Sequence, residues 1–132
     1  LPDNVSFQRF KNVLDEKAHA IFQGKVIVAI DAQKTDGQQM AQTILLSDDA
    51  EISCKPELEI YADDVECAHG ATVGALDEDM VFYLRARGIE LKQAQKLLIH
   101  AFVSEICDDL PEALKAVSDQ LIGNWLSKHL DD

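Results

Sequence analysis

The sequence lacks the features that would assign it to a membrane or secreted class. No apolar run approaches the roughly 18 to 20 residues that a membrane-spanning helix needs. No basic segment followed by an apolar one predicts a secretory signal. A cytoplasmic location is therefore the default expectation. The chain starts at Leu1 rather than at methionine, which indicates a processed product or a fragment.

Basic residues are scarce, with 12 Lys and Arg against 24 Asp and Glu, for a formal net charge of −12. A field of this sign opposes binding to nucleic acid or to anionic membrane surfaces, and we expect neither partner. The glycine-rich patterns that cradle phosphates are absent as well. Eleven acids lie between Ser47 and Asp79, against the single base Lys55. This acidic stretch is either a solvated face or a surface for a basic partner.

Cysteine is also scarce, and no CxxC pair predicts a closed metal site. The three cysteines, Cys54, Cys67 and Cys107, are expected to be free thiols in a cytosolic protein. One of them lies two residues before a histidine, in the stretch VECAHGATV. Strand alternation places Cys67 and His69 on one face, about 6.6 to 7 Å apart along the strand.

Several interpretations of Cys67 and His69 stay open. Thiolate and imidazole together suit zinc, iron and iron–sulfur chemistry, but two ligands are fewer than the four or so of a closed site. A buried thiol beside a hydrogen-bonded histidine is the structural alternative. A nucleophile and base pair is disfavoured, because the two groups are too far apart. Missing ligands could come from Cys54, from acids between 47 and 66, or from a second subunit, which the small residues around His69 favour.

The chain changes character near Asp77. Before it, period-two alternation predicts strands over residues 26–30, 43–47, 51–54, 58–62 and 65–73, with residues 18–30 mainly β and the segment before them ambiguous. Ile44, Ile52 and Ile60 recur every eight residues. Short, evenly spaced strands are typical of a sandwich, a barrel or a β-solenoid, and an eight-residue half-rung would suit the last.

After Asp77 the apolar period becomes helical. Asp77 is a good N-cap and Gly88 a natural C-terminal stop, so a first helix lies between them. A second helix is predicted over residues 91–107, and Pro111 opens a third. The sequence therefore predicts a β region over residues 1–76 and a helical region over residues 77–132.

Several longer motifs resemble a known family. DAQKTDGQQ, LLSDDA, KPELEIYADDV, CAHGATVG and FYLRARGI stand in the order and spacing of the C-terminal part of the SufB/SufD family of iron–sulfur cluster assembly scaffold proteins. The resemblance covers about Phe7 to Ser104. The B-type relative has Glu-His-Glu-Ala-Thr where this chain has Cys-Ala-His-Gly-Ala-Thr, which favours the D-type branch.

The resemblance implies a mainly β fold followed by helices: the C-terminal rungs of a right-handed parallel β-helix, then a helical region. It implies a non-enzymatic scaffold that pairs with a SufB-like subunit, with a nascent cluster at their interface. His69, with Cys67 as an accessory, is the candidate cluster ligand. A SufC-like ATPase would dock on the helical region, where the matching residues are Phe82, Tyr83, Arg85 and Arg87.

The cluster would be transient cargo, with no cofactor stably bound by this chain. A cut β-helix exposes an unpaired edge, so the isolated chain is expected to form a homodimer. One rival is a purely structural subunit in which the Cys-x-His pair belongs to the core. A β-helical enzyme is disfavoured, because no aligned carboxylate pair or activated nucleophile is evident.

Overall fold

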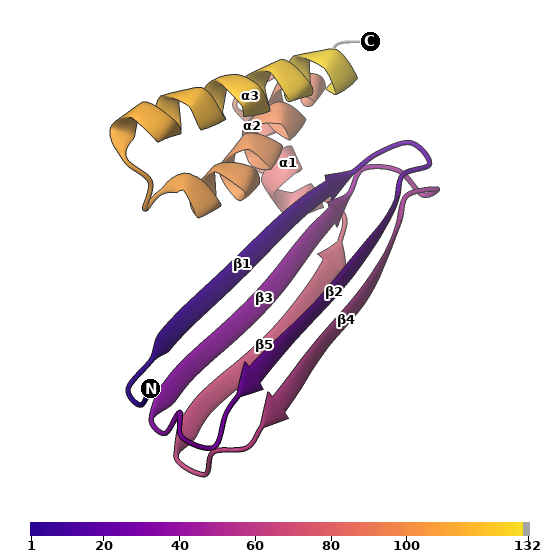
Figure 1. Ribbon diagram of the computed structural model, residues 1–132. Coiled ribbons are helices and arrows are strands. Elements are labelled where there is room, and N and C mark those ends of the chain that lie inside the picture. The colour runs from indigo at the N-terminus through magenta and orange to yellow at the C-terminus, as the bar shows by residue number, and fades with distance from the viewer. Residues whose placement is uncertain (131–132) are drawn as a thin grey trace. The chain divides into compact units, whose positions relative to one another are not determined.

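The computed structural model describes residues 1–130 and divides the chain into two compact units, residues 1–74 and residues 75 onward. The first unit contains five strands (Figure 1): β1 Val5–Leu14, β2 His19–Val28, β3 Thr35–Leu45, β4 Glu51–Ile60 and β5 Val65–Gly74. The second contains α1 Glu78–Ala86, α2 Leu91–Ser104, a 3₁₀ turn at Glu105–Cys107 and α3 Glu112–Leu130. The last two residues of the predicted helical region lie outside the described residues.

The strands alternate between two sheets, with the order β1-β3-β5 in one and β2-β4 in the other. Every ladder is parallel: Val5 pairs with Asp36, Thr35 with Val65, and His19 with Glu51. The prediction of a β region followed by helices is confirmed. Parallel strands in two sheets are compatible with the expected β-helix, whose closure and hand stay predictions.

The strand prediction was wrong at two strands. The strand expected over residues 43–47 starts much earlier, because β3 runs over Thr35–Leu45. Residues 51–54 and 58–62 do not form two short strands, because β4 runs without a break through Pro56, which pairs with Gly24 of β2. In the described part of the chain β4 has a single neighbour, and an edge strand tolerates proline. The eight-residue spacing of isoleucines therefore marks no structural repeat. The ambiguous segment before residue 18 is also a strand, β1.

The interior of the β unit is narrow and partly polar. The inward side of β3 carries Thr35, Gly37, Gln39, Ala41 and Thr43, all buried. Ladder partners point to the same side of a sheet, so Phe10 of β1 lies beside Ala41, and its ring centroid is 4.8 Å from that of Phe22 on β2. Ala41 is fully buried, whereas Phe22 is half-buried and Phe10 stays 42% exposed.

In the second unit the predicted ends of α1 are confirmed, whereas the second helix, predicted over residues 91–107, ends at Ser104 and is followed by a 3₁₀ turn. The side chain of Asp77 accepts hydrogen bonds from the backbone N–H groups of Asp79 and Met80, at 2.9 and 3.2 Å. Gly88 follows α1 with φ +87°, a left-handed conformation that favours glycine. Ala94 and Ile99 of α2 and Leu126 of α3 are buried. Among the described helices, none combines the length and the apolar character needed to cross a membrane.

Replacing Gly24 with Ala should destabilise the β unit. The added Cβ would lie 2.7 Å from both Nε2 and Oε1 of Gln39, a side chain that is itself buried. Moving this amide should lower the free energy of unfolding by about 1 to 3 kcal/mol, measured by urea denaturation. The matched control is Gly74→Ala, where no atom lies within 4 Å of the new Cβ. That variant should be neutral or gain up to about 1 kcal/mol. Equal effects of the two substitutions would contradict this account.

Candidate functional site

Strand β5 carries both candidate ligands on its inward side. Cys67 pairs with Gly37 and His69 with Gln39, so each ligand lies next to a buried position of β3. Cys67 is half-buried, whereas His69 is exposed. The predicted alternation is therefore realised: the two side chains project from the same side of one strand, and His69 is the more open to solvent. In the described part of the chain β5 has no neighbour beyond β3, so His69 stands at a sheet edge.

A row of polar side chains runs across the sheet and ends at His69. Gln8, Gln39 and His69 occupy equivalent ladder positions on β1, β3 and β5. Gln39 Nε2 donates a hydrogen bond to Gln8 Oε1 at 2.8 Å. Gln39 is only 3% exposed, and its Oε1 is buried with no hydrogen-bond partner among the described residues. An unsatisfied buried acceptor of this kind costs about 1 to 3 kcal/mol, so its retention requires an explanation.

The neighbouring sheet makes room for this row. Gln39 fits where it does because Gly24 of β2 has no side chain. Neither Gln39 nor Gly24 was among the residues predicted from the sequence. A glycine inside a strand pattern can indicate a close approach of another chain segment, and this was the available signal. The glycine pattern did not identify Gln39 as the residue that approaches Gly24, because Gln39 lies in the other sheet.

Cys67 is more enclosed than His69. Its sulfur would lie 3.2 Å from a Cβ placed on Gly37, so the absence of a side chain at Gly37 accommodates the thiol. Cys54, proposed as a further ligand, lies on β4 in the other sheet and pairs with Phe22. All three cysteines are free thiols. No group of three or more His, Cys, Asp and Glu side chains in residues 1–130 is arranged to hold a metal ion. Cys67 and His69 alone are fewer than the four or so ligands of a closed site.

The residues predicted to bind an ATPase lie at α1. Phe82 is 74% exposed and Tyr83 49% exposed. Arg87, just past the helix, places its guanidinium carbon 3.6 Å from the centroid of the Tyr83 ring, a cation–π contact. Arg85 is exposed in the last turn of the helix. An aromatic and basic surface of this composition is suited to an interface, since aromatic residues and arginine are enriched there.

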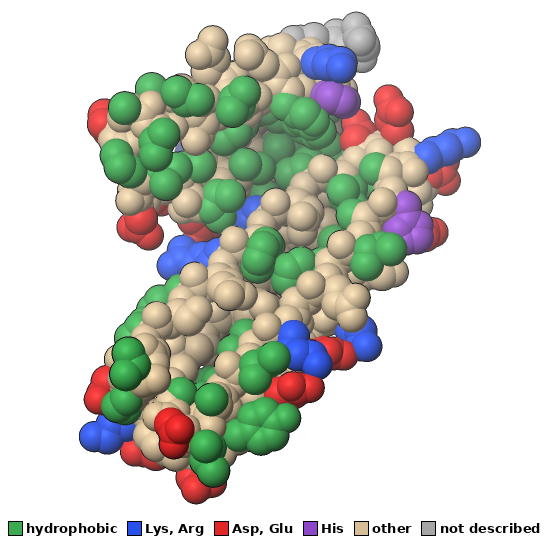
Figure 2. Space-filling model, in the orientation of Figure 1, with side chains coloured by type: hydrophobic (Ala, Val, Ile, Leu, Met, Phe, Trp, Pro, Cys, Tyr) green, Lys and Arg blue, Asp and Glu red, His purple; other side chains and the backbone are tan. Residues whose placement is uncertain are grey.

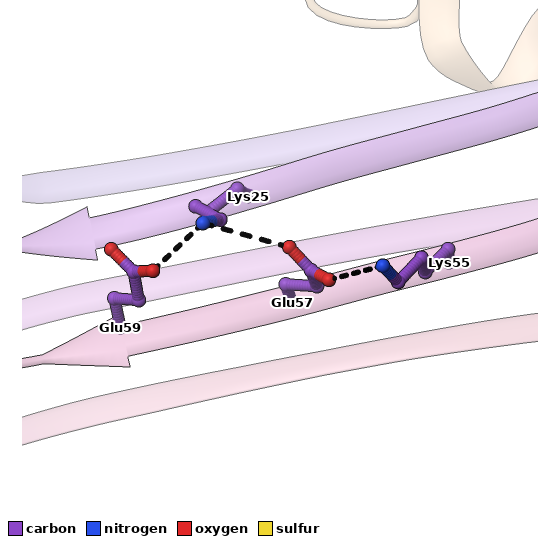
Figure 3. A network of polar contacts seen from close by, with 4 residues as sticks. All are labelled: Lys25, Lys55, Glu57 and Glu59. Atoms are coloured by element: carbon purple, nitrogen blue, oxygen red, sulfur yellow. Dashed lines mark hydrogen bonds and ion pairs between the residues drawn. The ribbon is translucent and has the colours of Figure 1, made fainter.

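Part of the acidic stretch is paired with lysines on the outer side of β2 and β4 (Figure 3). Lys25 Nζ lies 2.7 Å from Glu59 Oε1 and 3.7 Å from Glu57 Oε2, and Lys55 Nζ lies 2.8 Å from Glu57 Oε1. The hydrogen bond and charge of Glu59 raise the pKa of Lys25 above 10.5. The hydrogen bond and charge of Lys55, followed by the charge of Lys25, lower the pKa of Glu57 below 4.5.

Figure 2 shows basic and acidic side chains next to one another on this face of the β unit. These lysine pairs involve Glu57 and Glu59 of the eleven acids, and they lie on β2 and β4 rather than on the Cys67–His69 side of β5. At Glu57 and Glu59 the acidic charge is balanced by lysines of the same chain.

Comparisons with known proteins agree on one class, the iron–sulfur cluster assembly proteins of the SUF system. Residues 2–102 match the family model described as SUF system FeS cluster assembly, SufBD core domain. The chain therefore belongs to the SufBD core family, and the family prediction is confirmed.

Several curated relatives are similar over most of the chain. The iron–sulfur cluster assembly protein SufD of Escherichia coli is 48% identical over 111 residues, covering 83% of this chain and 26% of the relative. An iron–sulfur cluster assembly SufBD family protein of Synechocystis is 48% identical over 112 residues, covering 85% and 25%. The chloroplastic protein ABCI7 of Arabidopsis thaliana is 41% identical over 120 residues, covering 90% and 25%. The chain thus spans about a quarter of the length of these relatives.

Replacing Lys25 with Met should cause a small loss of stability at neutral pH, because exposed ion pairs are screened by water and salt. The loss should shrink when salt is added. It should also fade as the pH falls below 4.5 and through the pKa of Glu57, because protonated carboxyls no longer attract Lys25. Unfolding in urea at several pH values would measure this, with Lys17→Met in the exposed turn after β1 as control. A loss that persists in high salt or grows in acid would contradict the pairing.

Proposed function

We propose that this chain is part of a non-enzymatic scaffold subunit for iron–sulfur cluster assembly. In this proposal a SufB-like subunit pairs with the β unit, whose strands belong to a right-handed parallel β-helix. The nascent cluster forms at the interface of the two subunits and leaves as cargo, so no cofactor is held stably. Support comes from membership of the SufBD core family and from two relatives that are named as iron–sulfur cluster assembly proteins. The expected cytoplasmic location is part of the proposal.

His69 carries this proposal. It is an exposed imidazole on an edge strand, next to a thiol on the same side, without the further ligands that a closed site needs. Ligands from another subunit can complete such a pair. Incomplete coordination also suits an assembly site, since a cluster held by few ligands of this chain can be released. Cys67, half-buried and against Gly37, is an accessory ligand in this scheme.

The enclosure of Cys67 supports one alternative. The thiol occupies interior space that Gly37 leaves open, as a small core residue would. In this second proposal the Cys-x-His pair is a feature of the fold, and the subunit serves only to hold its partners together. The two proposals differ in what His69 contributes, because an exposed side chain adds little to the core.

We further propose that α1 is the docking surface for a SufC-like ATPase. Phe82 would insert into a pocket of the partner, with Tyr83, Arg85 and Arg87 around it. The support is the exposed, aromatic and basic surface described above. The unpaired edges of the β unit support a homodimer of the isolated chain, since exposed parallel edges pair readily with another copy.

Replacing His69 with Ala should remove cluster from an intact complex. We expect iron and acid-labile sulfide on the purified complex to fall at least about tenfold, since changes even to outer-shell partners of a metal can cost that much in affinity. The protein would be co-expressed with its SufB-like and SufC-like partners, and assembly confirmed by size-exclusion chromatography.

The matched control is His19→Ala, which removes another exposed strand histidine. His19 lies on the outer side of β2, and its Nδ1 is 3.8 Å from Oε2 of Glu51 on β4. This variant should keep the wild-type cluster load. An unchanged load in His69→Ala, with the complex intact, would support the purely structural role instead.

Replacing Phe82 with Ala should weaken ATPase binding by about tenfold or more, since exposed aromatic residues at the centre of interfaces are often hot spots. The control is Leu121→Ala, which removes a 64% exposed apolar side chain from α3. Binding would be measured by isothermal titration calorimetry with the purified ATPase. Equal affinities of the two variants would show that the partner does not dock through Phe82.

A further inference from the structure

We propose that Gln39 is a positioning residue for His69, with its free Oε1 accepting a hydrogen bond from the imidazole. This inference rests on the proposed function in so far as it treats His69 as a cluster ligand. Its structural basis is independent of that function: a buried acceptor without a partner, and a donor in the adjacent ladder position.

The ladder brings the two groups within reach. Gln39 and His69 are direct partners on neighbouring parallel strands and point to the same side, so their backbones are about 4.8 Å apart. The Nε2 group of Gln39 is engaged with Gln8 at 2.8 Å, and this bond holds the amide in place. The oxygen of the same amide is then the atom left to bind something else. The next side chain along the row is His69.

The surroundings leave Gln39 little freedom but His69 a great deal. Gly24 provides the space in which the amide lies, and Gln39 is almost completely buried. The imidazole is exposed at the sheet edge, so it can turn about its side-chain bonds toward Gln39 without displacing a packed neighbour. A fixed acceptor beside a movable donor is the arrangement by which an outer-shell group orients a metal ligand.

The hydrogen bond would determine which nitrogen of His69 is available. The nitrogen that donates to Gln39 Oε1 must carry the proton. The other nitrogen is then deprotonated in the neutral ring, and its lone pair is free to bind iron. Gln39 would thereby select one tautomer of His69 before any metal arrives, and would hold the ring in one orientation during assembly.

The test is the tautomer ratio of His69 in the metal-free chain. Long-range ¹H–¹⁵N correlation spectra at alkaline pH report this ratio, and the His69 signals are identified by their loss in His69→Ala. Replacing Gln39 with Leu should change the ratio about fivefold, the amount that one hydrogen bond of ordinary net strength sustains. Gln39→Glu, which keeps an acceptor oxygen that the Gln8 amide can turn to meet, should preserve the wild-type ratio.

The control is Thr43→Val, which removes another buried polar group of β3. The hydroxyl of Thr43 accepts a hydrogen bond from Asn12 Nδ2 at 3.2 Å and lies away from the Gln39 row. This variant should leave the His69 tautomer ratio unchanged. If Gln39→Leu fails to fold, the unmodified chain still decides the matter. A nuclear Overhauser effect between the imidazole N–H and the Gln39 side chain is expected, and its absence would overturn the proposal.

The same variants separate this inference from the proposed function. Gln39→Leu should also lower the iron content of the assembled complex about 10- to 100-fold, and Gln39→Glu should restore it. If Gln39→Leu changes the tautomer ratio but His69→Ala keeps the wild-type cluster load, only the cluster role of His69 is overturned. An unchanged tautomer ratio in a folded Gln39→Leu would overturn the positioning by Gln39 alone.

Discussion

Strands β1, β2 and β3 each pair in parallel with the strand two places later in the chain. This pairing determines which interior side chains of the β unit become neighbours. Because partners across a parallel ladder point to the same side and lie one strand spacing apart, side chains form rows perpendicular to the strands. Gln8, Gln39 and His69 form one such row, and Gly37 and Cys67 belong to the next. A shift of one residue in the β3–β5 register would move both candidate ligands to the opposite side of the sheet.

The narrow space between the sheets explains why glycine and glutamine occur together here. A long polar side chain fits inside only where the facing strand has no side chain, and Gly24 provides that position for Gln39. The amide must also be satisfied, which Gln8 achieves for its nitrogen only. A purely structural interior could have used apolar side chains at no such cost. Core packing alone therefore does not explain why Gln8 and Gln39 are polar. A role in holding His69, the last member of the row, does.

Local patterns predicted much of this, and long-range pairing accounts for the rest. Alternation along one strand sufficed to place Cys67 and His69 on the same side, and Asp77 and Gly88 marked the ends of α1 through capping chemistry that depends on adjacent residues. The continuity of β4 through Pro56 was not predictable in this way, because it depends on the neighbour that β4 has in the sheet. The contact of Gln39 with Gly24 likewise joins strands in different sheets.

In the proposed scheme, the edge position of β5 links the chemistry of His69 to the assembly of subunits. An imidazole in the middle of a sheet would have neighbours on both sides, and its ligands would have to come from the same chain. At the edge, Gln39 lies on one side of His69, while the other side is open to a strand that would pair with β5. Under the proposed function, a second subunit would supply ligands only in the register that its own strands adopt, so docking and ligand geometry would be determined together. A cluster built across such a boundary would lose the ligands of one subunit when the subunits separate, which would provide a physical route to release.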